Sequence, residues 1–116
     1  MTNNKNNQNI RFFPATKLRE HLREQALAAA TRIARSVGRL TSCDELPCEE
    51  YDEEVAYQQE LVRQMLYFQN CRTAVEKCIA GGSATVRYRW SDGTVTVTKF
   101  RKADLGRIRV IGLNAA

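Results

Sequence analysis

The sequence predicts an α+β fold: two long helices, a two-stranded antiparallel β-hairpin, and a short C-terminal helix with an extended tail. Three observations carry this prediction. Two segments repeat apolar residues at helical spacing, and two alternating segments flank an Asp-Gly pair. With 116 residues the chain has room for one modest core. We divide it into an extended arm (residues 1–15), a helical extension with an acidic connector (16–50) and a helix–hairpin unit (51–116).

The first helix is predicted to begin at a Thr16 cap and to end near Val37 and Gly38. Its apolar positions recur every three or four residues: Leu18, Leu22, Ala26, Ala29, Ile33, Val37 and Leu40. Before it, an Asn-rich stretch over 1–9 has nothing to bury, so alone in water it should be disordered. Phe12 and Phe13 then predict either an anchor that docks on a neighbouring molecule or a cap on the protein's own first helix.

The second helix is predicted to open at the acidic run from Glu49 to Glu54, which lies favourably at the positive end of the helix dipole. It should end at Gly81-Gly82. Near 30 residues, it exceeds an ordinary globular helix of ~11–12 residues. We therefore expect it to run past the core toward a neighbour, or to kink around Asn70.

Asp92-Gly93 is the preferred pair for a two-residue type I′ turn between strands over 84–91 and 94–100. This register places Trp90 opposite Val95 and Tyr88 opposite Val97. The predicted hairpin core, packed on the preceding helix, is Val86, Tyr88, Trp90, Val95 and Val97. The other face then carries Thr85, Arg87, Arg89, Ser91, Thr94, Thr96 and Thr98. Residues 102–108 predict a short helical turn, and 109–111 alternate like a strand.

The residue types offer little material for catalysis. Cys43, Cys48, Cys71 and Cys78 fit no familiar zinc spacing, and His21 is the single histidine. Cys71 and Cys78 are seven residues apart, so we interpret them as small buried groups on one helix face, with a disulfide or a metal as the alternative. We predict no enzyme, no cofactor and no metal. There is neither an apolar run long enough for a membrane span nor a secretory signal, so we expect synthesis in a cytoplasm.

Charge is strongly segregated along the chain. Residues 1–41 carry a net charge of +6, residues 42–60 carry −8, and residues 61–116 carry +7. This layout suits a subunit whose neighbours are copies of itself, with positive faces against negative ones. It also suits a protein that lies near nucleic acid. The third interpretation is three solvated surfaces without a partner.

Residues 71–111 carry a more specific order: a helix with Val75 and Ile79, Gly81-Gly82, the Asp92-Gly93 hairpin, then Ala103-Asp104-Leu105. This order resembles the gpW-like head–tail joining proteins of tailed bacteriophages, although the family's last helix is interrupted here by Gly106 and Gly112. The resemblance implies a non-catalytic connector subunit in the virion, made in the bacterial host. It implies a ring, dodecameric in the family, that docks on the portal protein, extends the DNA channel and receives the tail or the next neck protein.

Two sets of residues follow as candidate contacts. Within a connector, Arg87 and Arg89 are the candidates for lining a DNA passage, and Phe12 and Phe13 are those for docking on the portal or a neighbour. The alternative function is a small basic nucleic-acid-binding protein. That protein would use Arg19, Arg23, Arg32, Arg35 and Arg39 with Arg87 and Arg89, and Tyr88 and Trp90 for stacking on single strands. The predicted register, however, places these two rings on the face opposite Arg87 and Arg89, which favours core packing.

Overall fold

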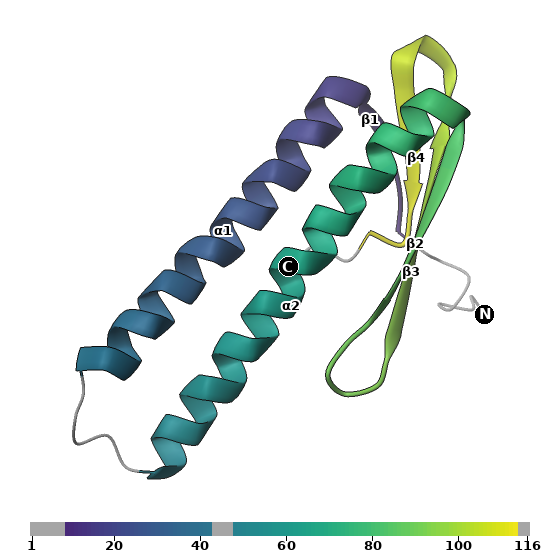
Figure 1. Cartoon of the computed structure of the whole chain (residues 1–116). Coiled ribbons are helices and arrows are strands. Elements are labelled where there is room, and N and C mark those ends of the chain that lie inside the picture. The colour runs from purple at the N-terminus through teal and green to yellow at the C-terminus, as the bar shows by residue number, and fades with distance from the viewer. Residues whose placement is uncertain (1–8, 43–47, 114–116) are drawn as a thin grey trace.

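The computed structural model describes residues 9–42 and 48–113, and Figure 1 shows the elements in order. Strand β1 (Ile10–Pro14) leads directly into helix α1 (Ala15–Ser42), and helix α2 (Cys48–Gly81) follows the connector. Three strands complete the described chain: β2 (Ser83–Arg89), β3 (Val95–Lys102) and β4 (Arg107–Ile111). The Asn-rich segment over 1–8, Cys43 and the acids at 44 and 45 lie outside the described residues.

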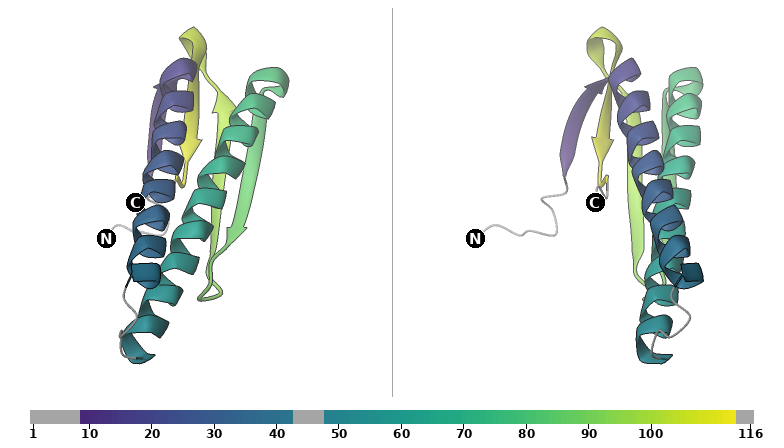
Figure 2. Two further views of the ribbon diagram at one scale, coloured as in Figure 1. Left: turned by 60° about the vertical axis from the view of Figure 1, so that its left-hand side comes forward. Right: turned by 90° about the vertical axis from the view of Figure 1, so that its left-hand side faces the viewer.

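The fold has two layers, a pair of antiparallel helices on one side and a four-stranded antiparallel sheet on the other (Figures 1 and 2). The strand order is β1-β4-β3-β2. The α+β class is therefore as predicted, but the two-stranded hairpin is wrong, because two further strands extend it. All three predicted segments contribute to this one unit, and they share a single core.

The predicted N-terminal arm is an edge strand of the sheet. Ile10 lies opposite Ile111, Phe12 opposite Arg109 and Pro14 opposite Arg107. The partner strand lies at the far end of the sequence, so no local turn signals this pairing. Five residues ending in proline are suited to a sheet edge, where proline removes no needed donor. The amide of Gly112 also donates to the carbonyl of Asn9 at 3.0 Å, which holds both ends of the described chain together.

The predicted C-terminal helix is replaced by one 3₁₀ turn, Asp104–Gly106, and strand β4. Leu105 and Gly106 both have positive φ, 61° and 69°, so the chain reverses instead of propagating a helix. Strand β4 then pairs with β3, with Arg101 opposite Arg109. The strand-like alternation predicted for residues 109–111 is confirmed.

Both helices are longer than the ordinary globular helix. Helix α1 continues through Gly38 to Ser42, beyond the predicted end at Val37, and Arg39 in its last turns forms an ion pair with Glu54 of α2. Helix α2 is continuous through Asn70 and ends as predicted, with Gly82 at φ 97° donating to the carbonyl of Cys78. The lower ends of both helices extend beyond the sheet (Figure 1).

The β2–β3 hairpin has a three-residue loop, not the predicted two-residue turn. Trp90 pairs with Thr94 through the amide of Trp90, and the amide of Gly93 donates to the Trp90 carbonyl at 3.0 Å. Gly93 takes a positive φ of 89°, as a type I turn followed by a bulge requires. Asp92 stabilises this loop because its carboxylate accepts the amide and the hydroxyl of Thr94.

The extra loop residue shifts the β2–β3 register by one position, so the side chains of β3 exchange faces relative to the prediction. Arg89 pairs with Val95 and Arg87 with Val97, so the predicted pairs Trp90–Val95 and Tyr88–Val97 are wrong. Val95 and Val97 belong to the outer face and leave the hairpin core. Thr96, Thr98 and Phe100 face the helices in their place. A one-residue slip has this effect because side chains alternate between faces.

The core lies between the helix pair and the inner face of the sheet. Its large buried side chains are Leu18, Leu22, Tyr67, Phe68, Val75, Phe100, Ile108 and Val110. Cys71 and Cys78 are fully buried free thiols among them, which confirms their interpretation as small core groups. The two helices are further joined by the ion pairs Arg19–Glu76 and Arg39–Glu54.

Candidate nucleic-acid interface

The outer face of the sheet, turned away from the helices, is uncovered and strongly basic. Alternation along the strands and the cross-strand register place six cations on it: Arg87, Arg89, Lys99, Arg101, Arg107 and Arg109. None of the described strand positions on this face carries an acid. We call these six residues the basic sheet face. Such a density of one sign creates a field that attracts polyanions.

These cations are available for a ligand. In the described part of the chain, the ion pairs within 4.0 Å are those of Arg19 and Arg39, and neither involves the basic sheet face. Arg109 lies on β4, between β3 and β1, and is half-buried, and its Nε is a buried donor without a hydrogen-bond partner. Arg107 donates only a long hydrogen bond, 3.4 Å, to the carbonyl of Asp104. Free guanidinium donors are suited to phosphate oxygens.

Phe12 and Phe13 lie on opposite faces of β1. Phe13 stacks on His21 of α1, with ring centroids 5.7 Å apart, so it caps the protein's own first helix. Phe12 lies on the outer face, about half exposed, and the Arg107 guanidinium lies 5.3 Å from its ring centroid. The two phenylalanines therefore do not form one docking anchor, and only Phe12 belongs to the basic sheet face.

Tyr88 and Trp90 lie on the inner face, opposite Arg87 and Arg89, as the predicted hairpin core has them. Tyr88 and Trp90 pack together with centroids 4.9 Å apart, and both contact the ring of Tyr67. Trp90 also donates from its indole to Thr96 at 2.7 Å. With Val86 they confirm the helix-facing part of the predicted hairpin core. This packing leaves Phe12 as the aromatic ring on the outer face.

The helix arginines form a weaker candidate surface. Glu76 and Glu54 bind Arg19 and Arg39 through two hydrogen bonds each. These guanidinium partners lower the pKa of both carboxyls, so both remain charged well into the acid range. Arg23, Arg32 and Arg35 are exposed on α1, and they serve below as matched controls for the sheet cations.

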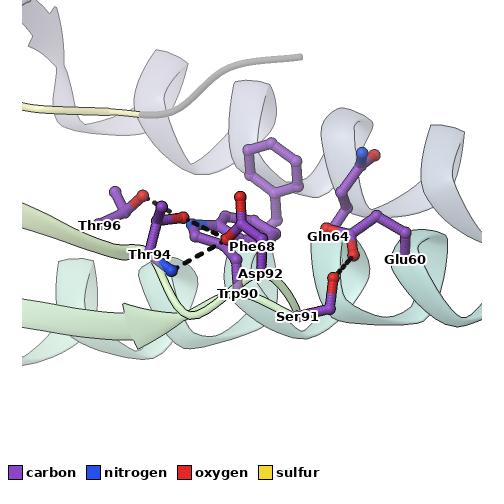
Figure 3. A pocket seen from close by; sticks show the side chains of 8 residues that line it. All are labelled: Glu60, Gln64, Phe68, Trp90, Ser91, Asp92, Thr94 and Thr96. Atoms are coloured by element: carbon purple, nitrogen blue, oxygen red, sulfur yellow. Dashed lines mark hydrogen bonds between the residues drawn. The ribbon is translucent and has the colours of Figure 1, made fainter.

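A cleft of about 410 Å³ lies where the hairpin loop meets α2 (Figure 3). It is lined by Glu60, Gln64, Phe68, Trp90, Ser91, Asp92, Thr94 and Thr96. Ser91 donates to Glu60, and the hydrogen bonds from Thr94 lower the pKa of the Asp92 carboxyl. Both carboxylates thus hold the hairpin loop in place, and the lowered pKa of Asp92 does not suit it to proton transfer near neutral pH.

Two further groups have a structural explanation. Burial raises the pKa of the Cys71 thiol to about 12, so it is a poor nucleophile. Burial, with Arg11 nearby, lowers the pKa of His21, which stays neutral in its stack on Phe13.

Among residues 9–42 and 48–113, no cluster of three or more His, Cys, Asp or Glu could hold a metal. No helix in these ranges is both long and apolar enough to cross a membrane.

Four of the six cations were not predicted as site residues: Lys99, Arg101, Arg107 and Arg109. They share a face with Arg87 only in the observed register. The sequence signal that could have found them is the recurrence of basic residues at every second position, at 99 and 101 and again at 107 and 109.

In comparisons with known proteins, no protein-family model, curated protein or solved structure matches the chain.

Proposed function

We propose that this protein binds the phosphate backbone of nucleic acid through its basic sheet face, without base-specific readout and without catalysis. The observation that carries the proposal is six cations on one uncovered face, with neither an acid nor an ion pair among them. Contacts between such cations and phosphates position a protein on nucleic acid but carry no sequence information.

The test is fluorescence anisotropy with labelled oligonucleotides of scrambled sequence at several salt concentrations. If all six cations contact phosphates, the logarithm of affinity should fall with the logarithm of salt with a slope of about −4 on single strands. Replacing Arg87, Lys99 and Arg101 by Gln should weaken binding to every sequence and reduce that slope by about 2.

A matched control variant with the same net charge separates the effect of position from the effect of total charge. The triple replacement of Arg23, Arg32 and Arg35 by Gln removes the same three charges from α1, and it should leave the salt slope unchanged. Equal losses in the two triple variants would mean that net charge alone drives binding. Absence of binding to any oligonucleotide at low salt would reject the proposal.

A connector subunit in a phage head–tail joining ring is the second candidate, and it rests on the residue order over 71–111 together with the segregated charges. The chain after Leu105 returns as a strand, where the resembling family has a helix. In a ring the basic sheet face would line the DNA passage, and Phe12 would meet the portal or a neighbour. Native mass spectrometry and electron microscopy, with and without a portal ring, test the connector proposal. A protein that stays monomeric and does not bind the portal would exclude it.

A further inference from the structure

The six cations of the basic sheet face form one continuous diagonal. Arg89 and Arg87 lie on β2, Lys99 and Arg101 on β3, and the pair of Arg109 and Arg107 on β4. Successive same-face residues of a strand are ~7 Å apart, and neighbouring strands are ~5 Å apart. The diagonal therefore crosses the sheet in steps of ~5–8 Å and spans roughly 30 Å. We call it the cation track.

Apolar side chains follow one side of this track in register. Val95 lies opposite Arg89, Val97 opposite Arg87 and Ile111 opposite Lys99. Phe12 lies opposite Arg109, and Pro14 opposite Arg107. Val95, Phe12 and Ile10 at the end of the row are each about half exposed, so the strip is open to a ligand. The other side of the track carries the small polar residues Ser83 and Thr85.

We infer that the ligand of this face is a single-stranded nucleic acid, which runs along the diagonal with phosphates on the cations and bases over the apolar strip. This inference rests on the proposed phosphate binding and specifies its substrate. A duplex presents phosphates but hides the faces of its bases, so it would leave the strip uncovered. Unpaired bases cover apolar and aromatic surface without regard to sequence.

Phe12 is the residue that distinguishes the two ligands. It is the aromatic ring of the strip, on strand β1, and the Arg107 guanidinium lies over one face of it, 5.3 Å from the ring centroid, which leaves the other face for a base. One base stacked there should account for a roughly five- to hundredfold gain in affinity. Because Phe12 is half exposed and outside the core, its replacement should leave the fold intact.

The experiment compares a labelled 12-nucleotide oligo(dT) with a 12-base-pair duplex by anisotropy at one salt concentration. We expect the single strand to bind at least tenfold more tightly. Phe12→Leu should lose about tenfold on the single strand with an unchanged salt slope, and Phe12→Tyr should restore it. Circular dichroism checks that each variant is folded, and amide shift mapping of the native chain should place the perturbed residues on all four strands, from Arg87 and Arg89 on β2 to Phe12 on β1.

The outcomes separate the two proposals. Equal or tighter duplex binding, or a Phe12→Leu variant that is folded and unaffected, overturns the single-strand inference and leaves phosphate binding in place. If neither the single strand nor the duplex binds, both the phosphate-binding proposal and the single-strand inference are overturned. A basic face with an apolar strip also resembles surfaces that bind anionic lipid. Binding to phosphatidylserine vesicles without binding to oligonucleotides would therefore overturn both proposals in favour of a membrane surface.

Discussion

The hydroxyl of Tyr67 on α2 lies 2.6 Å from the hydroxyl of Thr98 on β3, and both side chains are fully buried. Thr98 in turn donates to the carbonyl of Gly112 at 3.0 Å. This chain of hydrogen bonds links the helix layer to two parts of the sheet. It also explains how a threonine is accommodated inside the core, since its hydroxyl is satisfied on both sides.

Replacing Tyr67 by Phe should destabilise the protein by about 0.5–1.5 kcal/mol, because the hydrogen bond to Thr98 is lost while the ring packing remains. Urea denaturation measures the difference in the free energy of unfolding. Tyr51→Phe is the matched control, since Tyr51 is about half exposed on α2 and should tolerate the same change. Equal effects at the two positions would contradict the importance of the Tyr67–Thr98 contact.

Two glycines should respond to alanine in opposite directions. At Gly38, inside α1, a Cβ meets no atom within 4 Å, so Gly38→Ala should stabilise by about 0.5–1 kcal/mol. At Gly112, φ is 78° and a Cβ would lie 2.5 Å from the carbonyl oxygen of Val97. Gly112→Ala should therefore cost more than about 1–2 kcal/mol. Thermal denaturation of both variants checks the sign, and a stabilised Gly112→Ala would contradict the observed backbone.

Leu105 combines a left-handed backbone, φ 61°, with a side chain that is 91% exposed. A leucine gains nothing from burial there and bears the steric cost of the conformation. Leu105→Asn should raise the free energy of unfolding by up to about 1 kcal/mol, because asparagine tolerates this backbone better. A decrease in denaturation midpoint would show that Leu105 has a packing role that the described contacts do not contain.

His21 should make stability depend on pH just below neutrality. Its pKa in the folded protein is lowered by burial, so the unfolded chain binds the proton more readily. Stability should be complete above pH ~6.5 and fall as the pH drops from that value toward the folded pKa. NMR titration of the one imidazole gives the folded pKa directly.

His21→Phe provides the control for this pH dependence. It keeps a ring against Phe13 and should remove the loss of stability below pH ~6.5. Glu54 and Glu76 contribute in a lower window, because their folded pKa values lie below the usual 4.5 and their ion pairs fail only as they protonate. An unchanged pH profile in His21→Phe would assign the effect to other groups.

Cys71 and Cys78 should resist alkylation in the folded protein. Both are fully buried, and burial raises the pKa of each thiol. Iodoacetamide at pH 8, followed by peptide mass mapping, should leave these two positions unmodified until guanidinium unfolds the chain. Rapid labelling of Cys71 under native conditions would show that the core opens locally.

Local signals in the sequence were sufficient for the helices and the end of α2, where apolar periodicity and Gly81-Gly82 act over a few residues. They failed for pairings made across the whole chain. β1 and β4 are each five residues long, and β1 pairs with β4 across almost the full length of the chain. At Asp92-Gly93 the error was one residue of loop length, yet it exchanged Val95 and Val97 for Thr96 and Thr98 on the inner face.

The candidate site shows the same division. Arg87 and Arg89 were assigned to an open face from alternation alone, and they lie there. Their four basic neighbours depend on the register of β3 with β4 and could not be placed without it. Phe12 and Phe13 are adjacent in sequence, but strand geometry turns their rings to opposite sides.

The overhanging ends of the helices give the molecule a direction. Glu49, Glu50, Asp52 and Glu53 lie in the first turns of α2, where the helices project past the sheet (Figure 1). Negative charge at that tip and positive charge on the far sheet make the protein an electric dipole. Near a polyanion such a dipole experiences a torque as well as an attraction. The protein should therefore approach with its basic sheet face toward the polyanion and the acidic tips of its helices toward the solvent.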